Sequence, residues 1–169
     1  PVDESFVGSP ITAIHLWFDR QIVDLPHAVL VGRVSQWVFR GDEEHLQKHE
    51  ELSSEGKGEK AYHCQVVISA SRGLCDGDRE QLLETVVSEL REIFPDAQAA
   101  RLIRSRVVTD PTAVLSVRPG IDTVRPAAVT PIKNLFLAGD WTQTGWPSTM
   151  EGAVRSGRYA ALMLAESAN

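Results

Sequence analysis

The sequence predicts an α+β fold in which a mixed β-sheet packs against helices, and three observations support this class. Several short segments are rich in β-branched and aromatic residues, as strands are, and one longer segment repeats apolar residues at helical spacing. A strand pattern followed by a capped helix pattern closes the chain. The 169 residues, 43% of them hydrophobic, have the composition of an ordinary globular protein.

The strands predicted for the first half are short and closely spaced. Ile11–Phe18 is one of them, and Ala28–Val31 and Gln36–Phe39 are two further candidates separated by Gly32. Tyr62–Ala70 is apolar without clear alternation, which is typical of a strand that is buried on both faces.

Between these strands lies a polar segment, Gly41–Lys60, with a helical turn expected at Glu43–Leu52 and a loop after it. The loop contains Gly56–Ala61, formally G-x-G-x-x-A. A dinucleotide-binding turn requires a strand before it and a helix after it, and neither pattern is present. We therefore do not interpret this segment as a nucleotide site.

Asp78–Phe94 is the clearest predicted helix. Asp78 can cap it with Gln81 three residues on, and Pro95 stops it. The apolar residues of its stripe are Leu82, Leu83, Val86, Val87, Leu90, Ile93 and Phe94.

Four segments complete the order of elements. Ala100–Val108 reads as a strand interrupted by Arg101, Arg104 and Arg106, and Arg118–Pro131 as an extended connector. Asn134–Ala138 is expected to be a short buried strand, and Pro147–Ala165 the last helix. The arginines are interpreted as a solvated or inter-domain face.

The last strand and helix flank the most informative stretch. The apolar strand ends at Gly139, and Asp140 follows at its carboxyl end, where ligands bind in open α/β sheets. A carboxylate at this place can accept hydrogen bonds from ribityl or ribose hydroxyls.

Ser148-Thr149-Met150-Glu151 matches the capping box S-x-x-E, which begins a helix. The free amides of its first turn and the helix dipole favour a phosphate or a flavin carbonyl oxygen. Small residues at Gly152, Ala153, Ser156 and Gly157 allow a flat ring or a strand to approach closely. The residues alone leave a second interpretation open, namely a strand, loop and capped helix that simply pack tightly.

Ala138-Gly139-Asp140-Trp141 followed by Pro147–Gly157 resembles the closing FAD motif of the flavin amine oxidase and phytoene desaturase superfamily. Less specific segments at Ser9–Thr12, Gln36–Phe39, Val67–Ala70 and Arg118-Pro119 resemble the squalene-associated FAD-dependent desaturases, a group that includes hydroxysqualene dehydroxylase. The likeness covers nearly the whole chain.

The resemblance implies FAD as the cofactor and a Rossmann-like setting for the motif. Asp140 would contact the ribityl–pyrophosphate part, and the amides near Thr149 and Met150 would face the isoalloxazine ring. The cofactor-binding residues expected in this way are Gly139, Asp140, Trp141, Pro147, Ser148, Thr149, Met150, Glu151, Gly152 and Ala153. No general acid or base is identified, because in this family the flavin performs the redox chemistry.

The resemblance also predicts the domain organisation. Residues 1–130 would be a substrate-domain portion, and residues 131–169 the C-terminal strand and helix of the FAD-binding domain. The G-x-G-x-x-G half that grips ADP is not found in this sequence. The chain also begins without Met, so we expect a fragment that is inactive without its N-terminal half.

The expected substrate is an apolar isoprenoid of the hydroxysqualene or carotenoid-precursor type, in squalene or hopanoid biosynthesis. Trp146 and His15 are predicted to line a substrate cavity, and they have the least support among the predicted site residues. Alternatives are an amine oxidase, a protoporphyrinogen oxidase, or a stand-alone binding module without catalysis.

Other functions find little support. The net charge of −6 disfavours nucleic acid, and no metal is expected, since His45 and His49 lack a third ligand and Cys64 and Cys75 lack zinc spacing. Few cysteines and no apolar run of membrane-spanning length predict a cytoplasmic location. An isoprenoid substrate adds peripheral contact with the inner face of the membrane. The bare edges of the last strand predict self-association.

Overall fold

The computed structural model describes residues 6–41, 60–75 and 77–167, and the chain divides into two compact units. The sheet unit is Ser9–Pro111, and the C-terminal unit combines Pro1–Gly8 with Thr112–Asn169. Residues 112–130 therefore group with the end of the chain, whereas the functional domain boundary at residue 130 stays a prediction. The turn expected at Glu43–Leu52, with His45 and His49, lies outside the described residues.

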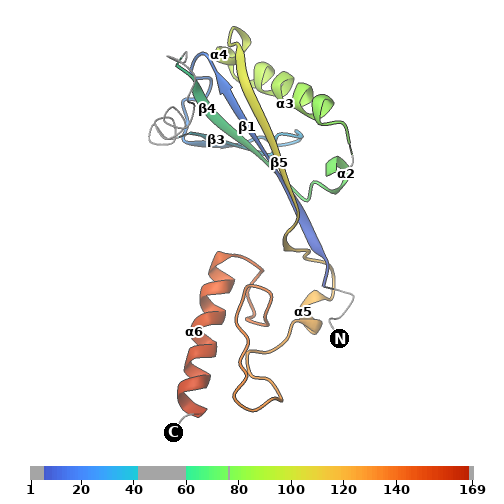
Figure 1. Cartoon of the computed structure of the whole chain (residues 1–169), viewed down its shortest axis with the longest axis vertical. Coiled ribbons are helices and arrows are strands. Elements are labelled where there is room, and N and C mark those ends of the chain that lie inside the picture. The colour runs from blue at the N-terminus through green and yellow to red at the C-terminus, as the bar shows by residue number, and fades with distance from the viewer. Residues whose placement is uncertain (1–5, 42–59, 76, 168–169) are drawn as a thin grey trace, which may run out of the picture. The chain divides into compact units, whose positions relative to one another are not determined.

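The sheet has five strands in the order β2-β3-β4-β1-β5 (Figure 1). Their bounds are β1 Gly8–Phe18, β2 His27–Val29, β3 Trp37–Arg40, β4 Tyr62–Ser69 and β5 Leu102–Leu115. The pairs β1–β4, β2–β3 and β3–β4 are antiparallel. Strands β1 and β5 also run in opposite directions, because Asp19 bonds Arg101 and Thr12 bonds Thr109. The predicted α+β class is confirmed, but the sheet is antiparallel rather than mixed.

One face of the sheet carries the core. Ile14, Leu16 and Phe18 alternate along β1, and Cys64, Val66 and Ile68 alternate along β4. The intervening residues of β4 are only partly buried, so the expectation of a strand buried on both faces is wrong. Burial raises the pKa of the Cys64 thiol to about 12, which makes it an inert core residue.

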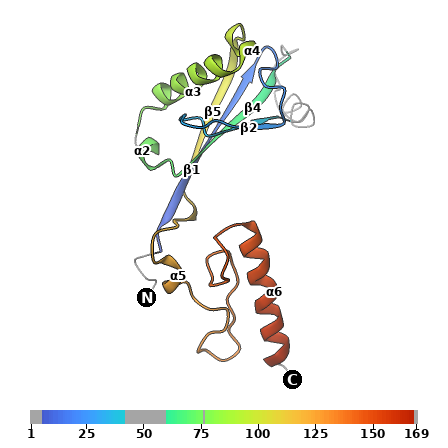
Figure 2. The same cartoon turned by 180° about the vertical axis from the view of Figure 1, so that it is seen from behind.

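Helix α3, Arg79–Ile93, runs along this apolar face (Figure 1, Figure 2). The Asp78 carboxylate accepts the Glu80 amide at 2.8 Å and caps the helix as predicted. Leu82, Val86 and Leu90 are buried against the strands. Two single-turn helices flank α3, namely α2, Arg72–Cys75, and α4, Pro95–Gln98.

The loop between β2 and β3 is tied to α3 by a carboxylate. Glu89 accepts the amides of Val34 and Ser35 at 3.0 and 2.8 Å, and Glu92 accepts Arg33 at 2.7 Å. Partial burial alone would raise the pKa of Glu89, but hydrogen bonds from Ser35 and Val34 and the charge of Arg33 lower it overall.

The other face of the sheet is lined by rings. His15 and Trp17 alternate with the core residues of β1, and His63 stacks between them at centroid distances of 5.3 and 4.9 Å. Arg104 lies over the Trp17 ring at 4.0 Å. A second group joins His27, Trp37 and Phe39. We call these residues the aromatic face.

The C-terminal unit contains α5, Ile121–Val124, and α6, Met150–Ser167, joined by loops. The connector predicted over Arg118–Pro131 therefore includes a helical turn. Asn134–Ala138 is not a strand but makes a single bridge, Val129 to Phe136. Asn134 adopts φ 63°, which breaks an extended segment at its start. The strand edges on which the prediction of self-association rested are thus not formed.

Candidate cofactor site

The segment from Gly139 to Thr142 forms a turn that is anchored on α6. The Thr142 amide and hydroxyl both donate to the Gly139 carbonyl, at 3.1 and 2.9 Å. The buried Ser156 hydroxyl of α6 accepts the Gly139 amide at 3.0 Å and contacts the Thr142 hydroxyl at 2.6 Å. Gly139 itself has φ 150°, and a Cβ there would overlap the Trp141 ring. The turn therefore needs glycine at this position.

Asp140 follows in the turn, and its carboxylate accepts a hydrogen bond from the Ser148 hydroxyl. The predicted capping box is consequently wrong in its assignment. Thr149 caps α6 instead, since its hydroxyl oxygen accepts the Gly152 amide at 3.2 Å. Glu151 pairs with Arg155 at 2.7 Å. The Ser148 hydroxyl donates to a charged acceptor, and such charge-assisted hydrogen bonds are strong. Helix α6 accordingly begins at Met150 rather than at Pro147.

The start of α6 offers amide donors and a partial positive charge, which suit an electron-rich ligand. The amides of Met150 and Glu151 belong to the first helical turn, and no acceptor for them is found among the described residues. The helix dipole adds a partial positive charge at the same end. The contact of these amides with a flavin stays a prediction.

The small residues of α6 differ in what they permit. A Cβ on Gly152 would lie 2.5 Å from the Pro147 carbonyl oxygen, so this glycine lets the preceding loop pack on the helix. Around Gly157 nothing lies within 4 Å of such an atom. At Gly152 and Ser156, the close approach predicted for this face is therefore made by other segments of the same chain, Pro147 and Gly139.

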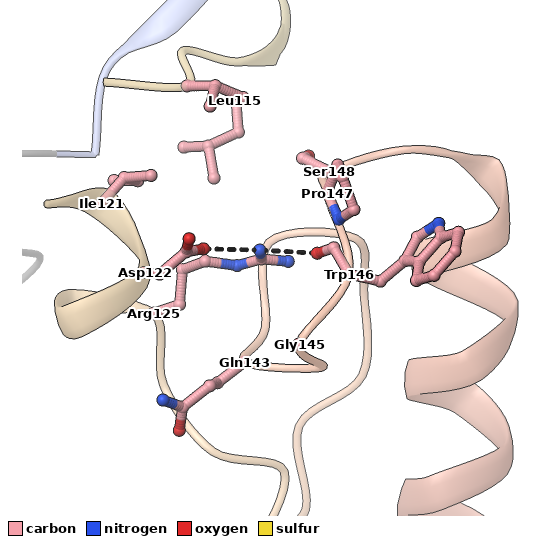
Figure 3. A pocket seen from close by; sticks show the side chains of 10 residues that line it. Leu115, Ile121, Asp122, Arg125, Gln143, Gly145, Trp146, Pro147 and Ser148 are labelled. Carbon is pink, nitrogen blue, oxygen red and sulfur yellow. Dashed lines mark hydrogen bonds and ion pairs between the residues drawn. The ribbon is translucent and has the colours of Figure 1, made fainter. Parts of the chain in front are cut away.

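Arg125 is a member of the site that the sequence did not reveal. Its guanidinium is buried and donates to the Asp140 carbonyl at 2.6 Å. It also donates to the Trp146 carbonyl at 2.8 Å and to the Asp122 carboxylate at 3.1 Å (Figure 3). The only signal was an Arg-Pro pair within a connector, and nothing in its spacing points to the turn.

A cavity of about 350 Å³ lies beside these groups. Leu115, Ile121, Pro147 and Ser148 line it together with Arg125 (Figure 3). A second hollow of about 320 Å³ is flanked by Phe6, Asp140 and Trp141, and the Phe6 and Trp141 rings meet edge to face at 6.4 Å. Asp140 is thus reached from a hollow with both apolar and polar lining.

The two predicted cavity residues lie in different units. Trp146 belongs to the C-terminal unit, and its ring lies beside α6 (Figure 3). The Arg155 guanidinium lies over this ring, 4.2 Å from its centroid. His15 belongs to the aromatic face, where its Nδ1 lies 3.1 Å from the Nε2 of His63. Their role towards a substrate stays a prediction.

The remaining polar candidates have structural roles. Asp19 accepts the Arg101 amide at 3.0 Å, and this bond, with the neighbouring Arg20, lowers the pKa of its carboxyl. Within the described ranges, no three His, Cys, Asp or Glu side chains come together as metal ligands. In the same ranges no helix is long and apolar enough to span a bilayer.

Comparison with known proteins identifies relatives of this chain. It is 28% identical over 158 residues to a 15-cis-phytoene desaturase of Synechococcus elongatus, covering 91% of this chain and 32% of the relative. It is 43% identical over 96 residues to a hydroxysqualene dehydroxylase of Rhodopseudomonas palustris, covering 57% and 22%. The chain thus spans about a third or less of these relatives.

A solved structure shares the fold. An oxidoreductase from Methanosarcina mazei matches with a TM-score of 0.53 at 17% identity, over 94% of this chain and 35% of that protein. The family model described as flavin containing amine oxidoreductase matches residues 4–163. This match confirms the predicted superfamily and implies an FAD cofactor. The chain belongs to the family of flavin containing amine oxidoreductases.

Proposed function

We propose that this chain is the C-terminal part of an FAD-dependent oxidoreductase that acts on an isoprenoid of the hydroxysqualene or carotenoid-precursor type. The observation that carries the proposal is the Asp140–Ser148 pair in front of α6, next to the amides of Met150 and Glu151. This arrangement joins a hydroxyl-binding carboxylate to an electropositive helix start, which suits a ribityl chain and a flavin carbonyl.

The residues would divide the work of holding FAD. Ser148 donates to one carboxylate oxygen of Asp140, and the other oxygen can accept a ribityl hydroxyl. The amides of Met150 and Glu151 would face an electron-rich oxygen of the flavin ring. Gly139, Trp141, Pro147, Thr149, Gly152 and Ala153 would shape the surface on which the ring rests. When bound, the flavin supplies the redox chemistry, and these residues orient it.

The proposed domains follow the resemblance. Residues 1–130 would contribute to a substrate domain, and residues 131–169 to a Rossmann-like FAD domain whose other half grips ADP. The exposed apolar side chains of the C-terminal unit support a covering partner of this kind. They include Val129, Ile132 and Leu135 in the loop, and Leu162 and Leu164 on α6.

An isoprenoid substrate is supported by the aromatic face and by the relatives' names. Trp37 and Phe39 are partly exposed, and their stacked rings offer an apolar surface to a polyene or polyprenyl chain. His15 belongs to the same aromatic face and would contribute to that surface, and Trp146 would lie near the flavin. A cytoplasmic location with peripheral membrane contact remains a further proposal.

The test compares substrates on the protein at its natural length, purified with FAD. We expect turnover of hydroxysqualene or of a carotenoid precursor, and none of a panel of amines or of protoporphyrinogen. Turnover of amines alone would replace our choice by an amine oxidase, and turnover of protoporphyrinogen by the corresponding oxidase.

A binding module without catalysis is the alternative from another class. Its natural reading frame would start immediately before Pro1, whereas an enzyme's would continue upstream into a strand and G-x-G-x-x-G. Sequencing the upstream region decides between the two.

A further inference from the structure

Arg125 is a buried cation, and its carboxylate partner among the described residues is solvent-exposed. The residue is 6% exposed, whereas the side chain of its carboxylate partner, Asp122, is 81% exposed. A solvent-exposed carboxylate contributes little to an ion pair, and burying a cation costs free energy unless other groups compensate. The compensation must therefore come from the other atoms that the guanidinium contacts.

Those atoms are two backbone carbonyls of one loop. Nη2 donates to the Asp140 carbonyl at 2.6 Å. Nη1 donates to the Trp146 carbonyl at 2.8 Å (Figure 3). Charge-assisted bonds of this length are stronger than neutral ones, and the planar fork of arginine fixes the separation of the two acceptors. Arg125 thus holds the two ends of the segment Asp140–Trp146 together.

The backbone after Arg125 reinforces this frame. The Gln143 amide donates to the Pro126 carbonyl, and the Leu137 amide donates to the Ala128 carbonyl, each at 2.8 Å. The connector therefore lies alongside both the approach to the turn and the turn itself. Arg125 adds side-chain hydrogen bonds on both sides of Gln143, to the Asp140 carbonyl and to the Trp146 carbonyl.

We propose that Arg125 is a positioning residue for the cofactor loop, which sets the place of the Asp140 carboxylate relative to the start of α6. The inference rests on the proposed function. Arg125 acts through the main chain of Asp140 and Trp146, and it needs no contact with the flavin. Its loss lets the loop open, so that Asp140 and Ser148 no longer share one geometry.

The test measures FAD binding to the protein at its natural length by quenching of flavin fluorescence, with the visible spectrum of the bound flavin as a second readout. Arg125→Met should weaken FAD binding by about tenfold or more, because two charge-assisted bonds are lost. Arg125→Lys should fall between, since an ammonium can reach one carbonyl but lacks the fork. Arg118→Met, an exposed arginine upstream in the same segment, is the matched control.

A double-mutant cycle separates positioning from general stability. If Arg125 acts through Asp140, the losses of Arg125→Lys and Asp140→Asn are not additive, and the bound flavin of both single variants shows the same shift of its visible band. Additive losses, or an Arg125→Lys protein that binds FAD as the Arg118→Met control does, overturn the positioning role. If Asp140→Asn itself leaves binding unchanged, the proposed cofactor site fails instead.

Discussion

The Ser148 hydroxyl donates to the Asp140 carboxylate, and the neighbouring Thr149, not Ser148, caps α6. Two adjacent hydroxyl residues therefore have separate tasks, one towards the turn and one towards the helix. Ser148→Ala should weaken FAD binding by about tenfold, since it removes a hydrogen bond to a charged group. The melting temperature should change little because the cap remains.

Fluorescence titration with FAD and thermal melting of the same samples check this expectation. Ser167→Ala, near the other end of α6, is the matched control, because its hydroxyl donates to the Leu164 carbonyl within the helix. Equal FAD affinity in the two variants would show that Ser148 does not prepare Asp140 for a ligand.

Thr149 provides the complementary prediction. Thr149→Ala should lower the free energy of unfolding by about 1 kcal/mol, the usual cost of losing an N-cap. Thr149→Ser keeps the oxygen that accepts the Gly152 amide and should retain most of that stability. Denaturant unfolding of both variants measures the difference, and a Ser variant as unstable as the Ala variant would assign the loss to the methyl group.

Two glycines of α6 form a matched pair for substitution. A Cβ at Gly152 would lie 2.5 Å from the Pro147 carbonyl oxygen, so Gly152→Ala should displace the loop and reduce both stability and FAD binding. Gly157 has open space, and Gly157→Ala should stabilise the protein by up to about 1 kcal/mol through helix propensity. Thermal melting and FAD titration report both effects, and a harmless Gly152→Ala would mean that Pro147 moves freely.

The sequence predicted the elements whose signals are local. Helix α3 carries its cap at Asp78 and its stripe in consecutive turns, so its bounds follow from the pattern. Asp140 was proposed from the expected order of strand, turn and helix and from the resemblance, and its contact with FAD stays a prediction. The strand at Asn134–Ala138 failed because apolar composition alone does not supply a partner strand.

The contributions that escaped prediction depend on residues far apart in the chain. Arg125 reaches carbonyls that lie 15 and 21 positions away, and carbonyls carry no sequence signature. The capping box failed for a related reason, since Ser148 bonds a side chain eight positions back. The expectation that β4 is buried on both faces overlooked the polar residues His63 and Gln65, which lie with Val67 on the face opposite the core.

The last prediction concerns pH. The pKa of Glu89 is lower in the folded protein than its ordinary value of 4.5. A lowered carboxyl pKa contributes stability above the ordinary value, and this contribution is lost as the pH falls through the folded-state value. Glu89→Gln should therefore lower the free energy of unfolding by about 1 to 2 kcal/mol near pH 7. The reason is that the hydrogen bonds from the Val34 and Ser35 amides lose their charged acceptor.

The difference between wild type and Glu89→Gln should shrink as the pH is lowered below 4.5, because protonation of Glu89 removes the same charge. Denaturant unfolding at a series of pH values measures it. Glu84→Gln, an exposed position of α3, is the control and should show no such convergence. A Glu89→Gln deficit that stays constant at acid pH would mean that the bonds to Val34 and Ser35 depend on the shape of the side chain rather than on its charge.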